Sequence, residues 1–236
     1  MASTIQLQRT IDYASKCLYS RPLTFTNPTD NEPALSCADW VMQTILAPPF
    51  NWSWNRVGAA PSLPLFQTQI GVSDYKVSLA TFGWVEKAVA YDPSSGFQAL
   101  ELQNLLNVGA DTLPNQSNRI AAQYYDGSGN VTFRIFPAAD KIYNIAVEYQ
   151  NAAPLFTTLT QTWSPIPDYL SYIYEEGFLA KAAEYCNDPR SMGMFQMFFT
   201  NLAANSEGLS STQKNLWLEN KLSTIRQTMA VQQGRS

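Results

Sequence analysis

The chain has 236 residues, 45% of them hydrophobic and 13% aromatic, which is enough to bury a sizeable core in one domain or a compact pair. Its net charge is −4 and it contains no run of basic residues, which argues against an electrostatic DNA-binding face. Only 14% of residues are charged, so much of the surface must be polar and uncharged or be covered by neighbouring subunits.

Several chemistries are missing from the residue inventory. The chain has no histidine, which removes the commonest general base and makes Ser-His and Cys-His nucleophile pairs impossible. Its three cysteines, Cys17, Cys37 and Cys186, lack zinc-site spacing, so we expect buried thiols in a reducing compartment. We therefore predict a protein that is not an enzyme and has no catalytic residues, metal or cofactor.

The N-terminal residues and the hydropathy pattern bear on localisation. The first six residues lack the basic start and apolar core of a secretion signal. No apolar run approaches the ~18–20 residues that a membrane span needs. We therefore expect a protein made in a cytoplasm, with no membrane partner.

Two helices open the chain. The first is predicted by an apolar stripe at helical spacing, formed by Leu7, Ile11, Ala14 and Leu18. A second helix begins near Pro33 and is stopped by Pro48 and Pro49. Two tryptophans follow, Trp52 and Trp54. They could form a sugar-stacking platform, but such residues more often fill the seam between a helical layer and a sheet.

The pattern then changes to β. Residues 67–72, 75–79 and 83–91 predict strands separated by turns, whereas residues 97–108 fit a helix or a strand equally well. Residues 118–150 contain three β-rich runs and predict an antiparallel meander. The turn at 126–130 resembles the start of a calcium loop, but Pro137 occupies the twelfth position and cannot supply the required carboxylate. We interpret the segment as a hairpin turn.

Three further helices are predicted at the C-terminal end. Pro167 and Asp168 open one helix, residues 191–205 form another, and the last begins at Ser210 or Ser211. The last helix carries a narrow apolar seam that is a candidate protein interface, formed by Trp217, Leu218, Leu222, Ile225 and Met229. The alternative is that this seam packs on the chain's own helices.

The order of these elements predicts an α+β fold. Helices from the two ends of the chain, residues 1–50 and 164–236, are expected to form one helical bundle. Residues 51–163 are expected to form a central antiparallel β-sandwich or small barrel.

The same order of elements carries a resemblance. An N-terminal helical pair ends in a tryptophan-rich loop, and strands with Tyr75 and Trp84 follow. A strand at 131–136 then runs into a Pro-x-x-Asp-x-x-Tyr step at 137–143, and a proline-led helix begins after 166–169. Over roughly residues 5 to 205, the chain resembles the head-to-tail adaptor (connector, or tail-tube A type) proteins of tailed bacteriophages. It departs from them in lacking a second proline in the 137–140 step and a basic start to the first helix.

The resemblance implies a structural protein of the virion. Such proteins form a ring, usually of twelve copies, between the portal and the tail or nozzle proteins. DNA passes through the ring during genome ejection without sequence-specific binding. In that family the C-terminal segment commonly inserts against the portal, and this role would fall on the seam from Leu218 to Met229.

Two alternatives belong to other classes. One is a carbohydrate-binding or glycoside-degrading β-sandwich protein, with Trp52, Trp54 and Trp84 as stacking platforms. The other is a different virion component, such as a tail-completion or capsid-decorating protein. The copy number, the portal-facing surface, the charge of the lumen and the host are left open by the sequence.

Overall fold

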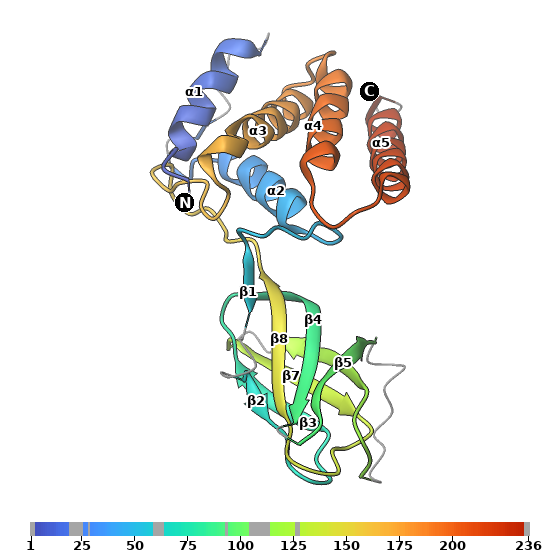
Figure 1. The fold of residues 1–236 in the computed structure, drawn as a ribbon. Helices are drawn as coiled ribbons and strands as arrows, with labels where there is room; N and C mark the ends of the chain where they lie inside the picture. The colour runs from blue at the N-terminus through green and yellow to red at the C-terminus, as the bar shows by residue number, and fades with distance from the viewer. Residues whose placement is uncertain are drawn as a thin grey trace. The chain divides into compact units, whose positions relative to one another are not determined.

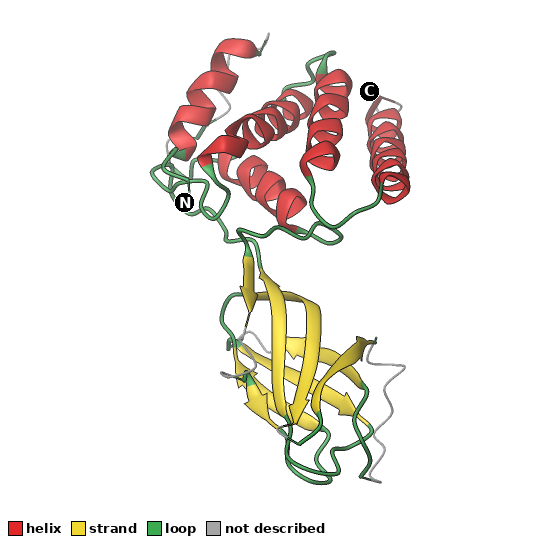
Figure 2. Ribbon diagram, in the orientation of Figure 1, coloured by secondary structure: helices red, strands yellow, loops and turns green. Residues whose placement is uncertain are grey.

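The computed structural model describes residues 3–18, 26–27, 29–58, 64–92, 94–103, 114–125 and 128–233. The chain divides into two compact units, one comprising Met1–Trp54 and Ala153–Ser236 and the other Asn55–Ala152. The first unit is helical and the second is built from strands (Figures 1 and 2). The predicted α+β class is confirmed.

The helical unit contains five α-helices in the described residues. They are α1 (Leu7–Cys17), α2 (Ala34–Leu46), α3 (Ser171–Tyr185), α4 (Ser191–Asn205) and α5 (Ser211–Gln233), with a 3-10 turn (Asp168–Leu170) leading into α3. Pro33 is the residue before α2, and Pro167 is the residue before the 3-10 turn. The helix positions therefore agree with the proline signals in the sequence.

Helix α3 is the common neighbour of three other helices in this unit. Helix α3 packs against α1, α2 and α4, and α4 in turn packs against α5. Helices α1 and α5 consequently lie on opposite sides of the unit (Figure 1). At the centre, the Trp163 ring stacks on Tyr174 with 4.5 Å between centroids, and its indole N–H donates to Thr10.

The segment that follows the last strand belongs to the helical unit, which differs from the predicted domain boundary at residue 163. The Leu7 amide donates to the Gln161 carbonyl, and the Trp163 amide donates to the Ile5 carbonyl. Phe156 and Trp163 are both buried in the helical core. Backbone pairing with the N-terminal segment, together with burial of these two rings, places residues 153–163 with the helices.

The β unit is one curled mixed sheet, a half-barrel, with the order β1-β8-β4-β5-β6-β7-β3 and with β2 also paired to β8. Its strands are β1 (Arg56–Gly58), β2 (Phe66–Gln67), β3 (Asp74–Ser78), β4 (Phe82–Asp92), β5 (Gly96–Leu102), β6 (Arg119–Tyr125), β7 (Asn130–Phe136) and β8 (Asn144–Asn151). Strands β5 and β6 pair in parallel, so the sheet is mixed where an antiparallel sandwich or small barrel was predicted, and that finer arrangement is not confirmed.

The predicted meander is half correct. Strands β6 and β7 form an antiparallel pair, but β8 pairs with β4, β1 and β2 and not with β7. The two edges of β7 are used by β6 and β3, which leaves no edge for β8. Alternation of apolar and polar residues along a strand does not determine which strand lies alongside it.

Two other expectations fall partly outside the described residues. Residues 96–102 form a strand, which settles the first part of the ambiguous segment 97–108, whereas 104–113 are not described. The turn 126–130 is described only from Ser128. In the described part of the chain, no helix is both long enough and apolar enough to cross a membrane.

Candidate functional site

The predicted interface seam on α5 packs against the chain's own helical unit. The Trp217 ring meets Phe50 edge-on at 4.6 Å and Phe199 edge-on at 5.6 Å. Three more seam residues are half-buried against the same core, namely Leu218, Leu222 and Ile225. The fifth, Met229, lies where side chains are not described. The sequence left open whether this seam packs on the chain's own helices or contacts another protein. In the structure, its described residues pack on the chain's own helices.

Helix α5 caps its own N-terminus. The Ser210 hydroxyl accepts the Gln213 amide, and the Gln213 side-chain oxygen accepts the Ser210 amide. This reciprocal pair satisfies backbone donors that a helix start leaves open. The first turn of α5 therefore needs no capping group from the rest of the bundle.

The face of α5 opposite the seam carries one large apolar residue, Leu216. It is 59% exposed. It precedes Ile225 by nine residues, so at ~100° per residue the two side chains point in opposite directions around the helix. The other exposed residues of this outward face are polar and mostly uncharged: Thr212, Glu219, Asn220, Ser223 and Gln227. The exposure of Leu216 could have been inferred from the sequence, because an apolar residue opposite a seam has no place in the chain's own core.

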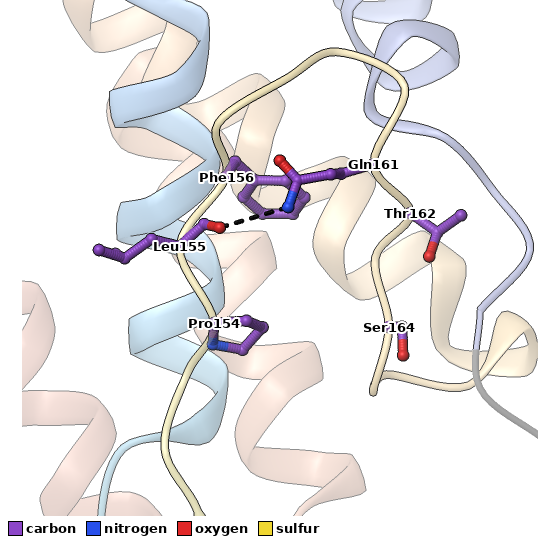
Figure 3. Close-up of a pocket in the computed structure, with 6 residues that line it drawn as sticks. All are labelled: Pro154, Leu155, Phe156, Gln161, Thr162 and Ser164. Carbon is purple, nitrogen blue, oxygen red and sulfur yellow. Dashed lines mark hydrogen bonds between the residues drawn. The ribbon is translucent and has the colours of Figure 1, made fainter. Parts of the chain in front are cut away.

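A small pocket of about 180 Å³ lies in the segment that joins the β unit to α3 (Figure 3). It is lined by Pro154, Leu155 and Phe156 on one limb of the segment and by Gln161, Thr162 and Ser164 on the other. The sequence reasoning missed this pocket, because its two limbs are positioned by different distant segments: the N-terminal residues pair with the second limb, and Asp39 of α2 binds the first.

The Gln161 side chain holds the two limbs of this segment together. Its oxygen accepts the Thr158 amide at 2.8 Å. Its nitrogen donates to the Leu155 carbonyl at 3.4 Å, as Figure 3 shows. The Phe156 amide donates to the Asp39 carboxylate of α2 at 2.7 Å. Burial raises the pKa of Asp39. These contacts fix the shape of the pocket without any ligand.

A larger pocket of about 530 Å³ lies between the start of α2 and the ends of α3 and α5. Its wall contains Cys37, and burial raises the pKa of that thiol to about 12. Lys181 lies over the Trp40 ring at 5.2 Å and pairs with Glu184. A thiol that stays protonated and an ammonium that is already paired are poor nucleophiles at neutral pH.

Two carboxylates, Asp168 and Glu184, make structural contacts within the helical unit. Asp168 accepts the Ser3 and Thr4 hydroxyls, and the Ser3 hydrogen bond lowers its pKa. Glu184 pairs with Lys181, and burial raises the pKa of Glu175. Within the described ranges, no group of three or more histidine, cysteine, aspartate or glutamate residues could hold a metal ion.

The tryptophans bear on the carbohydrate alternative. Trp52 is 1% exposed in the helical core, and its ring stacks on Trp54 at 5.3 Å. Trp54 is itself partly buried against that core, and Trp84 is half-buried on β4. Because a sugar-stacking platform requires an open ring face, Trp52 cannot serve as one.

Large apolar side chains are exposed on both units. The helical unit exposes Tyr13, Leu155, Tyr169, Tyr172, Tyr185, Met197 and Leu216, and the β unit exposes Val57, Ile70, Phe97, Leu102 and Ile142. Five of these side chains are at least 60% exposed. Exposed apolar side chains on a chain with few charges are suited to contacts with other proteins.

No family model and no curated protein sequence matches this chain.

Proposed function

We propose that this chain is a structural protein of a bacteriophage virion, a head-to-tail adaptor that forms a ring between the portal and the tail and lines the path of DNA exit. The observation that carries the proposal is the set of exposed apolar side chains on both units, on a surface with few charges. A protein that works through permanent contacts needs such surfaces, and rings typically require interfaces of 2,000 Å² or more. The order of sequence elements shared with adaptor proteins supports the same conclusion.

The two units have different roles in this proposal. The helical unit, which contains both ends of the chain, acts as the bundle that faces the portal or the lumen. The curled β unit serves as the small barrel that contacts tail or nozzle proteins, and its exposed Ile70 and Ile142 are suited to such contacts. The mildly acidic net charge of −4 fits DNA passage better than DNA binding.

The five seam residues of α5 keep their proposed interface role only if α5 leaves its own bundle. Such a step exposes the Trp217 ring and the half-buried side chains of Leu218, Leu222 and Ile225. A portal surface that covers the same residues would offset that loss, since burial of apolar area is non-directional. The self-capped start of α5 allows the helix to stay folded while it moves.

A portal retention experiment tests this function. The purified full chain is passed over immobilised portal protein of the same virion, with an unrelated monomeric protein of similar size as the control. We expect the chain to be retained and the control to pass. Passage of the chain would contradict the adaptor assignment, and retention by capsid or tail protein in place of the portal would favour a tail-completion or decorating protein.

A further inference from the structure

Glu175 of α3 is a half-buried carboxylate for which the described residues provide no partner. Within them it accepts no hydrogen bond and forms no ion pair. Each of the other half-buried or buried carboxylates in the described part of the chain accepts a hydrogen bond or pairs with a lysine or arginine. Because a carboxylate that is partly removed from water is stabilised by a partner, Glu175 is suited to receive one from outside the chain.

Arg9 of α1 is the nearby cation, but it does not neutralise Glu175. Burial raises the pKa of Glu175, and the opposing effect of Arg9 is the smaller of the two. Arg9 is exposed, and among the described residues its guanidinium forms no ion pair. The negative charge of Glu175 is therefore left largely uncompensated.

Two tyrosines with exposed rings lie beside this carboxylate. Tyr172 precedes Glu175 by three residues on α3, which makes the two side chains neighbours on the helix surface, and it is 39% exposed. Tyr13 is 46% exposed and belongs to α1, which packs against α3 (Figure 1). The pKa of Tyr13 is raised first by the Cys17 thiol and also by Glu175 and Glu176, so its ring lies within the field of both carboxylates.

Glu176 adds a second negative charge at the same place. Both of its oxygens accept the Asn201 side-chain amide, at 3.0 and 2.8 Å. An uncharged amide satisfies the hydrogen bonds of a carboxylate but does not neutralise it. Glu175 and Glu176 therefore present negative charge next to two tyrosine rings, and the complementary ligand is a cation.

An arginine side chain fits these groups better than other cations do. Successive residues on a helix point ~100° apart, so Glu175 and Glu176 do not converge on one metal ion. A guanidinium is planar, stacks on tyrosine rings and can donate two hydrogen bonds to one carboxylate, whereas an ammonium is more strongly hydrated. Tyrosine and arginine are also both enriched where proteins meet.

We propose that Glu175, flanked by Tyr13 and Tyr172, receives an arginine side chain of a partner protein. The guanidinium lies against the tyrosine rings and donates to the Glu175 oxygens, and Glu176 adds attraction at longer range. The inference goes beyond the proposed function, because it assigns a surface of the helical unit and the chemistry of the group that binds it. It holds whether or not the chain forms a ring.

Titration with a short peptide tests the site in the full chain. The probe is a glycine-arginine-glycine peptide with blocked ends, and its control carries citrulline, which has the shape of arginine without the charge. Ring signals are followed by NMR in tyrosine-labelled protein, and Tyr13→Phe and Tyr172→Phe assign them. The arginine peptide should shift both signals and bind about fivefold more tightly than the citrulline peptide, since a partly exposed ion pair and a cation–π contact are each modest.

Three substitutions locate the binding at Glu175. Glu175→Gln keeps the size of the side chain and removes its charge, so affinity for the arginine peptide should fall about fivefold. Glu219→Gln is the matched control, because it removes the same charge from an exposed position on α5 and should leave binding unchanged. Arg9→Gln should strengthen binding, because it removes a nearby positive charge. Circular dichroism of each variant confirms that it is folded.

The outcomes separate this inference from the proposed function. Equal binding of the two peptides, unshifted Tyr13 and Tyr172 signals, or binding to the Arg9→Gln variant alone would overturn the site. Retention by the portal without binding of the arginine peptide would overturn the site and leave the adaptor function standing. Binding that depends on Glu175, in a chain that passes over the portal, would support the site and contradict the adaptor function.

Discussion

Gly177 lies where α3 passes close to two neighbouring helices. An ideal Cβ at this position would be 2.7 Å from Phe198 Cε2 and 3.0 Å from Val41 Cγ1. Phe198 and Val41 are both fully buried, so neither can move aside without disturbing the core. This glycine is required by packing, although glycine is otherwise a poor helix former.

We expect Gly177→Ala to lower the free energy of unfolding by about 1–3 kcal/mol, because the added methyl group overpacks the core. Gly193→Ala in α4 is the matched control, since nothing lies within 4 Å of its added Cβ. That change should raise the free energy of unfolding by up to about 1 kcal/mol through helix propensity. Urea unfolding measures both values, and equal stabilisation by the two substitutions would show that α3 has free space at Gly177.

Asp92 connects the stability of the β unit to pH. Its carboxylate accepts hydrogen bonds from Lys141, Ser94 and Ser95, and the Lys141 contact is the main reason why its pKa is lowered. A carboxyl group with a folded pKa below its unfolded value of about 3.9 stabilises the fold above that pH. This contribution is lost as the pH falls through the folded pKa.

The substitution Asp92→Asn should therefore destabilise the chain at pH 7 and have a smaller effect at pH 3. Other carboxylates, such as Asp74 beside Arg134, titrate in both proteins and cancel in the comparison. Thermal unfolding of the two proteins at both pH values gives the difference. A gap of constant size at the two pH values would mean that the Asp92 charge contributes nothing to stability.

Among the helices, α5 is held mainly by one neighbour. In the described structure it packs mainly against α4, and its seam residues are only half-buried. Its opposite faces have different predicted roles, since Ile225 contacts the chain's own core and Leu216 points away from it.

The substitution Ile225→Asp should loosen α5, because a charged group placed against an apolar core is desolvated without a partner. Leu216→Asp should leave α5 in place, because the new carboxylate lies in water. Hydrogen exchange followed by mass spectrometry should show lost protection in α5 for the first variant only. Protection in the β unit should be unchanged in both. Equal loss of α5 protection in the two variants would contradict the assignment of its faces.

Local signals predicted the helices well and the strand pairing poorly. The spacing of Leu7, Ile11 and Ala14 and the prolines at 33 and 167 positioned helices, because helix formation is governed by nearby residues. The partner of β8 and the parallel pair of β5 with β6 depend on contacts between distant segments. Alternation in a strand defines its buried face and leaves its neighbours open.

In the candidate site too, features set by local spacing could be predicted from the sequence, and features set by distant contacts could not. The α5 seam was found from its spacing, but whether it contacts its own bundle or another protein depends on the position of Phe50 and Phe199. The pocket at Pro154–Ser164 could not be predicted, because it depends on contacts with two distant segments, the N-terminal backbone and Asp39 of α2. Leu216 was not singled out from the sequence, although its position opposite the seam is a signal that could have identified it as exposed.

At the scale of the whole molecule, the proposed function depends on contacts with other proteins rather than on reactive groups. The chain has few charges, no histidine and exposed apolar side chains on both of its compact units. Each copy would offer one surface to the next copy and others to the portal and the tail.

The most direct measurement is electron microscopy of the purified full chain, alone and mixed with the portal protein of the same virion. The account predicts closed rings whose class averages show rotational symmetry and which stack coaxially on the portal. Particles that remain single at every concentration, with and without the portal, would contradict it.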